Sequence, residues 1–460
     1  MAYPDALPNN AQVNPDTEQL LTPSFPRRPH KFRMTPLHFV IGFMFSFLFV
    51  YLLFAPSTLP QLNPVIFVPG DGGSRVEAKL NKSSTVHYIC DKTTSDWFTL
   101  WLNLELLVPE VIDCFIDNLR LLYNNVTRTT SNSPGVSLRF PGFGHTDPVE
   151  WLDPSVRIGS YFSSIAAALV PLGYVRDLSM RGAPYDFRKA PNENQAYFAD
   201  LKALIEETYD LNGGATPIVL VAHSMGSLMS LYFLQRQSSA WKKKFIRSLV
   251  TLAAPWGGSV KAIKVFAVGD DLGVYVLSKN TLKVYQVTCP STSWLLPSEH
   301  YWSKDEVLVQ TPETNYTLTN LEQFFEDIDF KQGWDMRLDV RDVVNDVRPP
   351  GVELHCLHGS HVSTPKQLVY GPKKFPDSPQ YVMDDGDGTV NMRSLQGCTK
   401  WQGKQAQPVI HRVFPNADHM SLLSDKNLLS YLAELLKLKS PDEYETPTRW
   451  KFVNKILNFF

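Results

Sequence analysis

A serine near the middle of the chain lies in a pattern that can perform nucleophilic catalysis. Ser224 follows the apolar run Ile218–Ala222 and lies within Ala222-His223-Ser224-Met225-Gly226, ahead of a probable helix over Leu228–Leu234. A serine at a sharp turn between strand and helix is exposed at the edge of a sheet, and the amide of the next residue faces a developing oxyanion. The usual motif begins with Gly, and Ala is also small. We predict that Ser224 is a nucleophile; the alternative is an ordinary buried turn serine.

Such a nucleophile needs a base, and the base needs an acid that fixes its tautomer. Downstream of the serine, one acidic loop contains Asp384, Asp385 and Asp387, and His419 follows the alternating stretch Val409–Phe414. Serine, aspartate, histidine is the order expected for this kind of turn. The acidic loop lacks the third oxygen ligand and the terminal Glu of an EF-hand calcium site. On its own, His419 would be interpreted as a surface histidine.

The elements that must position these residues are those of a parallel sheet. Val65–Val68, Ile218–Ala222 and Leu249–Ala253 are short apolar runs, as expected of strands buried on both faces. Between the first two, apolar residues recur at helical spacing over Tyr197–Tyr209, and Gly213-Gly214 ends that helix. Strand, helix and strand in alternation predict an α/β fold with helices on the faces of the sheet.

A second histidine cluster, His355, Cys356, His358 and His361, has the residue types of a metal site. Val352–Leu357 alternates like a strand, however, which points His355 and His358 to opposite faces. The chain also contains no HExxH, Walker or dinucleotide-binding motif. We therefore expect no metal and no cofactor.

The composition excludes two function classes. With 44 Lys+Arg against 46 Asp+Glu, 43% hydrophobic and 20% charged residues, the 460-residue chain is neither disordered nor a polybasic nucleic-acid binder. Its length agrees with three domains or with one α/β domain that carries inserts, and the motifs favour the second.

The N-terminus predicts export. Residues 1–36 are rich in Pro and Asn and are predicted to form a disordered cytosolic tail. Leu37–Ala55 has no charged residue and is long enough to span a bilayer. Lys and Arg precede it and none follows before Arg75, so the positive-inside rule places the rest in the lumen. Cleavage after Ser57, as a signal peptide, competes with retention as the anchor of a type II membrane protein.

Export permits disulfides, and the five cysteines suggest two bridges and one leftover thiol. Cys90 and Cys114 bracket an apolar insert, Cys356 and Cys398 lie late in the chain, and Cys289 stands alone. Three glycosylation sequons agree with a lumenal surface. They begin at Asn81, Asn125 and Asn315.

Between Pro64 and Leu438 the chain contains a specific set of short motifs. In chain order they are Phe67–Gly73, His87–Cys90, Trp101–Glu105, Met180–Asp186, Val221–Gly226, Ala254–Gly258 and Asp385–Val390. With them the stretch resembles the lecithin:cholesterol acyltransferase-like family of α/β-hydrolases, and within it lysosomal phospholipase A2. Matched by position, the resemblance implies Ser224 as nucleophile and His419 as base. It implies Asp387, rather than Asp384 or Asp385, as the acid, and the amides of Asp71 and Met225 as the oxyanion hole.

The resemblance also implies an α/β-hydrolase core that is interrupted by a membrane-binding insert and a cap. Trp97, Phe98 and Trp101 are the expected membrane contacts of the insert, the alternative being burial against the core. Val265–Thr288 is the expected mobile lid, and the C-terminal extension is either an interfacial helix or packed on the core. The expected segments are core over 58–83, insert over 84–150, core over 151–255, cap over 256–345, core over 346–438 and the extension over 439–460.

The implied activity is that of a calcium-independent lumenal phospholipase and O-acyltransferase. It would move a fatty acyl chain from a glycerophospholipid at a membrane surface to water or to a lipid alcohol such as ceramide. The resemblance places such a protein in the lysosome or outside the cell. The alternatives are a sterol acyltransferase of the same family and a catalytically silent lipid-binding protein.

Overall fold

The computed structural model describes residues 62–153, 159–270 and 279–437. The predictions for residues 1–36, 37–55 and 439–460 therefore lie outside the described residues. Within the described ranges, no helix has the length and the apolarity needed to cross a bilayer.

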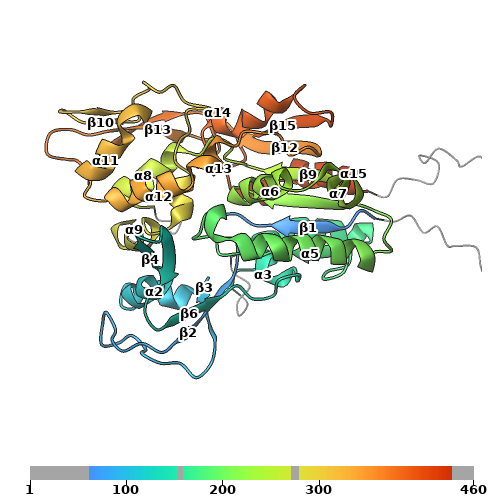
Figure 1. The fold of residues 1–460 in the computed structure, drawn as a ribbon, viewed down its shortest axis with the longest axis horizontal. Helices are drawn as coiled ribbons and strands as arrows, with labels where there is room; N and C mark the ends of the chain where they lie inside the picture. The colour runs from blue at the N-terminus through green and yellow to red at the C-terminus, as the bar shows by residue number, and fades with distance from the viewer. Residues whose placement is uncertain (1–61, 154–158, 271–278, 438–460) are drawn as a thin grey trace, which may run out of the picture. The chain divides into compact units, whose positions relative to one another are not determined.

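The central element is a six-stranded sheet in the order β15-β12-β9-β8-β1-β7 (Figure 1). Every pair of neighbouring strands is parallel. The strands are β1 (Val65–Val68), β7 (Met180–Gly182), β8 (Ile218–His223), β9 (Ile246–Leu252), β12 (Glu353–Ser360) and β15 (Val409–Pro415).

The sequence explains why these strands form the centre of the sheet. β1 and β8 are fully buried along their length, because their apolar side chains are covered on both faces. The three apolar runs chosen from the sequence coincide with β1, β8 and most of β9. The predicted α/β-hydrolase fold class is confirmed.

Helices flank this sheet. The helix that follows the nucleophile turn, α6 (Met225–Gln235), contacts β1, β8 and β9. The helix predicted over Tyr197–Tyr209 is α5 (Gln195–Leu211), and it ends before Gly213 and Gly214, both at positive φ. The other elements along the core are α4 (Ser163–Leu169), η2 (Val170–Leu172), η3 (Pro191–Glu193), α7 (Ser239–Phe245), α14 (Met392–Leu395), η5 (Gln396–Trp401), η6 (Ser421–Ser424) and α15 (Lys426–Leu436).

The expected insert contains small antiparallel sheets and one helix of two turns. The order β3-β2-β6 defines one sheet, and β4 pairs with β5 in another. Buried Arg188 of the core ties this region down, since its guanidinium donates to the Leu119 carbonyl and to Asn132 Oδ1, both at 2.9 Å. β2 (Val76–Leu80) belongs to the first of these sheets, although it lies in the segment 58–83 that the sequence assigned to the core. The other elements are β3 (Phe98–Trp101), η1 (Leu104–Leu107), α2 (Ile112–Leu119), β4 (Leu121–Asn124), β5 (Thr129–Asn132), β6 (Val136–Arg139) and α3 (Asp147–Glu150).

The structure corrects one expected membrane contact. Trp101 is only 7% exposed, and its ring packs beside those of Phe115 and Phe187. Its indole Nε1 donates a 2.7 Å hydrogen bond to the Gly72 carbonyl. Trp97 and Phe98 are partly buried, and the Arg139 guanidinium lies 4.5 Å from the Trp97 ring centroid. Trp101 therefore supports the loop after β1 and is unavailable to a lipid surface.

The expected cap has its own hydrophobic cluster, which includes Phe266, Phe324 and Leu368. A sheet in the order β11-β10-β13-β14 belongs to it, so β13 and β14 come from the segment 346–438 that the sequence assigned to the core. The elements are α8 (Val260–Val268), α9 (Lys279–Gln286), α10 (Pro290–Trp294), β10 (Val309–Gln310), β11 (Asn315–Tyr316), η4 (Leu318–Asn320), α11 (Leu321–Asp327), α12 (Lys331–Asp339), α13 (Arg341–Asn345), β13 (Thr364–Val369) and β14 (Gln380–Asp384).

The expected lid, Val265–Thr288, has helices at both ends. Phe266 of α8 is buried in the cap cluster, and Leu282 of α9 is buried in the main core. Residues 271–278 between them lie outside the described residues, so the opening of this stretch stays a prediction.

Two disulfides join the four cysteines named from the sequence. Cys90 bonds to Cys114 and Cys356 bonds to Cys398, while Cys289 is a buried free thiol. All three sequon asparagines are exposed, as glycosylation requires. They are Asn81, Asn125 and Asn315.

Candidate active site

Ser224 occupies a strained turn between β8 and α6. Its φ of 52° and ψ of −128° lie in a region that residues with a side chain rarely adopt, as expected for a nucleophile at a sharp turn between strand and helix. Two glycines make the turn fit. A Cβ on Gly226 would lie 2.3 Å from the Pro69 carbonyl oxygen, and a Cβ on Gly70 would lie 2.7 Å from the Ser224 Cβ. The loop after β1 thus approaches Ser224 closely.

The serine, the histidine and one aspartate form a continuous hydrogen-bonded line. Ser224 Oγ lies 2.9 Å from His419 Nε2, and His419 Nδ1 lies 2.8 Å from Asp387 Oδ2. All three residues are buried, and Asp387 is completely so. They follow β8, β14 and β15 in the chain, and the fold brings together residues that are separated by up to 195 positions. This arrangement can pass a proton from the serine to the histidine.

Of the three candidate aspartates, all of which the structure describes, Asp387 is the one that bonds to His419. Asp384 pairs with Lys366 at 3.6 Å, and Asp385 accepts a 2.6 Å hydrogen bond from the His361 amide. Burial raises the pKa of Asp387, but His419 and the amides of Val390 and Thr389 outweigh burial, so the pKa lies below its ordinary value. The carboxylate is therefore charged and can stabilise an imidazolium.

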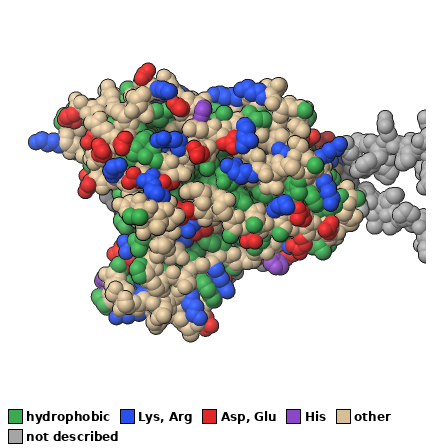
Figure 2. Space-filling view, in the orientation of Figure 1, with side chains coloured by type: hydrophobic (Ala, Val, Ile, Leu, Met, Phe, Trp, Pro, Cys, Tyr) green, Lys and Arg blue, Asp and Glu red, His purple; other side chains and the backbone are tan. Residues whose placement is uncertain are grey.

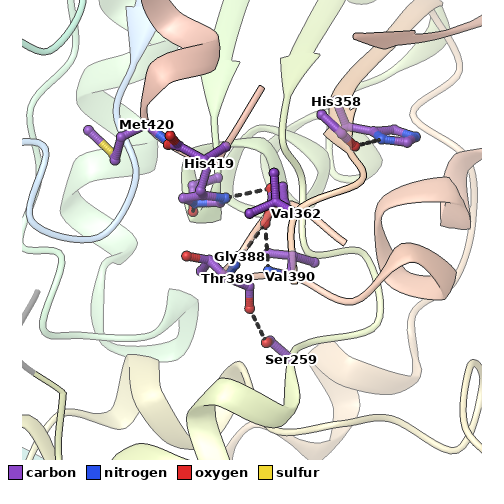
Figure 3. A network of polar contacts seen from close by, with 12 residues as sticks. Ser259, His358, Val362, Gly388, Thr389, Val390, His419 and Met420 are labelled. Carbon is purple, nitrogen blue, oxygen red and sulfur yellow. Dashed lines mark hydrogen bonds and ion pairs between the residues drawn. The ribbon is translucent and has the colours of Figure 1, made fainter. Parts of the chain in front are cut away.

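Hydrogen bonds hold the loop of Asp387 on both sides, and Figure 3 shows the one between Ser259 and Thr389. Ser259, the N-cap of α8, donates its hydroxyl to the Thr389 carbonyl. On the other side, the Gly388 amide donates to Thr364 Oγ1 at 2.8 Å. The His419 amide also donates to the Asp387 carbonyl at 2.8 Å. Residues of the expected cap thus take part in placing the acid.

The two residues expected to form the oxyanion hole come from the helix that follows Ser224 and from the loop that follows β1. Met225 is the first residue of α6, where backbone amides lack an intrahelical acceptor. Asp71 lies in the loop after β1, next to the Gly72 carbonyl that Trp101 holds. The Asp71 side chain reaches solvent, yet desolvation by the surrounding protein raises its pKa to about 6, against the opposing effects of Lys261 and the Gly72 amide.

Two residues next to this line were missed in the sequence. Tyr161 and His223 are buried and hydrogen-bonded to each other, and both contact the catalytic segments. His223 stands inside the serine motif, so its position was a usable signal. Nothing in the sequence singles out Tyr161, because the loop before α4 has no motif.

The second histidine cluster is divided by its own hydrogen bonds. His355 bonds to Tyr431 and Glu353, whereas His358 bonds to His411. Across residues 62–153, 159–270 and 279–437, no three His, Cys, Asp or Glu side chains are grouped so as to hold a metal ion.

Comparison with known proteins agrees with this geometry. The family model described as lecithin:cholesterol acyltransferase matches residues 97–426. "Lysosomal phospholipase A and acyltransferase" of Rattus norvegicus is 49% identical over 399 residues, which cover 86% of this chain and 95% of the rat protein. The Homo sapiens protein of the same name is 48% identical over 413 residues, or 89% of this chain and 98% of its own length.

A further relative is named for a sterol. "Phosphatidylcholine-sterol acyltransferase" of Mus musculus is 41% identical over 393 residues, which cover 84% of this chain and 89% of the mouse protein. All three relatives are thus named as acyltransferases. On the length of these matches, the chain belongs to the lecithin:cholesterol acyltransferase family.

Proposed function

We propose that this protein transfers a fatty acyl group from a glycerophospholipid to water or to a lipid alcohol such as ceramide, through an acyl-enzyme on Ser224. Membership of the family makes the chain a serine phospholipase and acyltransferase. The residue roles, the acceptor and the independence from calcium are our proposal. The observation that carries it is the hydrogen-bonded line from Ser224 through His419 to Asp387.

The first half of the reaction forms the acyl-enzyme. Ser224 Oγ attacks the ester carbonyl carbon while its proton passes to His419 Nε2, and Asp387 stabilises the imidazolium. The amides of Asp71 and Met225 donate to the oxyanion. The tetrahedral intermediate then collapses, the ester C–O bond breaks, and the imidazolium gives its proton to the departing lysophospholipid.

The second half reverses these roles. Water or the lipid alcohol donates its proton to His419 and attacks the acyl carbonyl carbon. The bond between this carbon and Ser224 Oγ then breaks, and the imidazolium returns the proton to Oγ. Side chains and backbone amides supply the base and the oxyanion donors in both halves. The mechanism therefore contains no step that calls for calcium.

The lipid surface is proposed to meet the insert at residues other than Trp101. Large apolar side chains of this region are exposed around the Cys90–Cys114 bridge, and Tyr88, at 89%, is the most exposed of them. Figure 2 shows charges of both signs interspersed over the viewed face of the molecule. The exposed apolar residues near the bridge are Val86, Tyr88, Ile89 and Val108.

We place the protein in an extracytosolic compartment. Two disulfides agree with an oxidising lumen. The rat and human relatives are named as lysosomal, which favours the lysosome for this chain. A sterol acceptor is the second candidate, because the mouse relative is named for one.

The test is to incubate the full chain with phosphatidylcholine liposomes that contain a short-chain ceramide or cholesterol, at acidic and at neutral pH, with a chelator present. We expect acylceramide and free fatty acid at acidic pH. If acyl-sterol were the main product, the acceptor would be a sterol and not ceramide. Absence of fatty acid release under every condition would contradict the proposal and leave a silent lipid-binding protein.

A further inference from the structure

Two buried side chains outside the catalytic triad connect its separate segments. Tyr161 lies just before α4, with its amide bonded to the Glu150 carbonyl at 2.8 Å, and His223 is the residue before Ser224. The Tyr161 hydroxyl bonds to His223 Nδ1 and also accepts from the Gly70 amide at 2.9 Å. His223 Nε2 lies 2.9 Å from the His419 carbonyl oxygen.

The partners determine the direction of each hydrogen bond. A carbonyl oxygen can only accept, so His223 carries its proton on Nε2 and donates it to His419. Nδ1 of a neutral imidazole is then an acceptor, and the Tyr161 hydroxyl donates to it. The hydroxyl oxygen in turn accepts from Gly70. Every polar atom of the two side chains is satisfied in this single arrangement.

This chain of hydrogen bonds touches three catalytic segments. Gly70 precedes Asp71 in the loop that is proposed to supply one oxyanion amide. His223 precedes the nucleophile, and the His419 carbonyl belongs to the base itself. The loop after β1 packs directly on Tyr161, and two of its glycines leave no room for a side chain. A Cβ on Gly70 would lie 2.9 Å from the Tyr161 hydroxyl oxygen, and a Cβ on Gly73 would lie 2.6 Å from the Tyr161 Cζ. The Tyr161 ring thus directly supports the oxyanion loop.

We infer that Tyr161 and His223 are positioning residues that hold the oxyanion loop and the base in register with Ser224. This inference rests on the proposed role of Ser224 as nucleophile. This role explains why two polar side chains are buried here. If apolar residues replaced Tyr161 and His223, the Gly70 amide would lose the hydroxyl acceptor that it has now.

The connection is uncharged over the pH range in which a lumenal enzyme works. Burial, together with the neighbouring His419, lowers the pKa of His223 to about 3, so the imidazole stays neutral in an acidic compartment. Burial raises the pKa of the Tyr161 hydroxyl far above its ordinary value. The hydrogen bonds therefore keep the same direction at acidic and at neutral pH.

The decisive variant is Tyr161→Phe in the full chain, assayed on a water-soluble ester so that membrane binding does not enter. We expect kcat to fall about tenfold to a hundredfold, because small displacements of catalytic groups are that costly, with KM within about twofold. The rate of fluorophosphonate labelling at Ser224 should fall in parallel. Tyr174→Phe is the matched control, since its buried hydroxyl bonds the Asn63 and Leu436 carbonyls, outside the catalytic segments.

Two substitutions of His223 separate its two hydrogen bonds. The amide nitrogen of Gln can replace Nε2 and keep the bond to His419, and the amide oxygen of Asn can replace Nδ1 and keep the bond to Tyr161. The Gln variant has already lost the bond to Tyr161, whereas the Asn variant still has it. Adding Tyr161→Phe should therefore lower the activity of the Gln variant less than that of the Asn variant. His355→Gln controls for loss of a buried, hydrogen-bonded histidine.

The inference is overturned if Tyr161→Phe keeps kcat within about twofold while its melting temperature falls as far as that of Tyr174→Phe. Should the His223 variants fail to fold, Tyr161→Phe decides alone, because it removes a single oxygen. A wild-type protein that hydrolyses the soluble ester but transfers no acyl group from phospholipid would refute the proposed function and leave this inference standing. Ester hydrolysis by Ser224→Ala would instead refute the nucleophile on which it rests.

Discussion

At the scale of single residues, the acid is the member of the proposed triad that the sequence alone left open. Asp384, Asp385 and Asp387 lie within four positions, and spacing does not say which of them faces His419. The family resemblance pointed to Asp387, and the structure places this carboxylate 2.8 Å from His419 Nδ1. The difference arises from a tight loop whose amides bond to Asp387, and such a loop has no signature in composition.

Substitution of these aspartates tests that assignment. Asp387→Asn should lower kcat by about 10⁴, because an amide presents the wrong group to His419 Nδ1 and cannot stabilise an imidazolium. Asp385→Asn is the matched control: its carboxylate bonds the His361 amide, and an amide oxygen can do the same. Ester hydrolysis by the two purified variants measures both. Equal losses would remove Asp387 from its role.

Asp71 gives a prediction for the pH profile. Its pKa of about 6 means that the side chain is neutral at acidic pH and ionised at neutral pH, where its charge opposes the neighbouring oxyanion. Asp71→Asn keeps the backbone amide but has no carboxyl group to ionise. As the pH rises from about 5 to about 7, the variant should therefore lose less activity than the wild type. The same shift makes folding stability of the wild type decrease as pH rises from about 4 through 6. Superimposable pH profiles, with Asp384→Asn as control, would contradict this account.

At the scale of elements, the core was predictable and the insert was not. β1, β8 and α5 follow from unbroken apolar runs and helical spacing, which depend on local sequence. The direction of Trp101 in β3 depends instead on where Phe115, Phe187 and Gly72 come to lie, and no local pattern encodes that. For the same reason, the pairing of β13 with β10 in the cap sheet had no signal.

Two substitutions in the insert should have opposite effects. Trp101→Ala should cost about 3–5 kcal/mol of unfolding free energy and lower hydrolysis of a soluble ester, since it empties the space under the oxyanion loop. Tyr88→Ser should leave both unchanged and weaken liposome binding by about tenfold. Urea unfolding, ester hydrolysis and liposome sedimentation measure these effects. Normal liposome binding by Tyr88→Ser would refute the proposed docking residues.

At the scale of the whole molecule, we expect a lumenal glycoprotein. The exposed sequons at Asn81, Asn125 and Asn315 should each carry a glycan when the full chain is expressed in mammalian cells. Endoglycosidase treatment should lower the apparent mass, and each Asn→Gln substitution should remove one step. Asn124→Gln, next to the second sequon, should remove none. If the protein recovered from these cells had reduced cysteines and no glycans, the predicted compartment would be contradicted.

If Ser224 is the nucleophile, its acyl ester can be trapped during turnover. The full chain is mixed with phosphatidylcholine liposomes, quenched in acid within the first turnovers, digested and examined by mass spectrometry. We expect a peptide containing Ser224 that is heavier by one fatty acyl group and that disappears when ceramide is added as acceptor. The Ser224→Ala protein should give neither the ester nor product. Product formed at the wild-type rate by Ser224→Ala, or an acyl ester on another residue, would contradict the account.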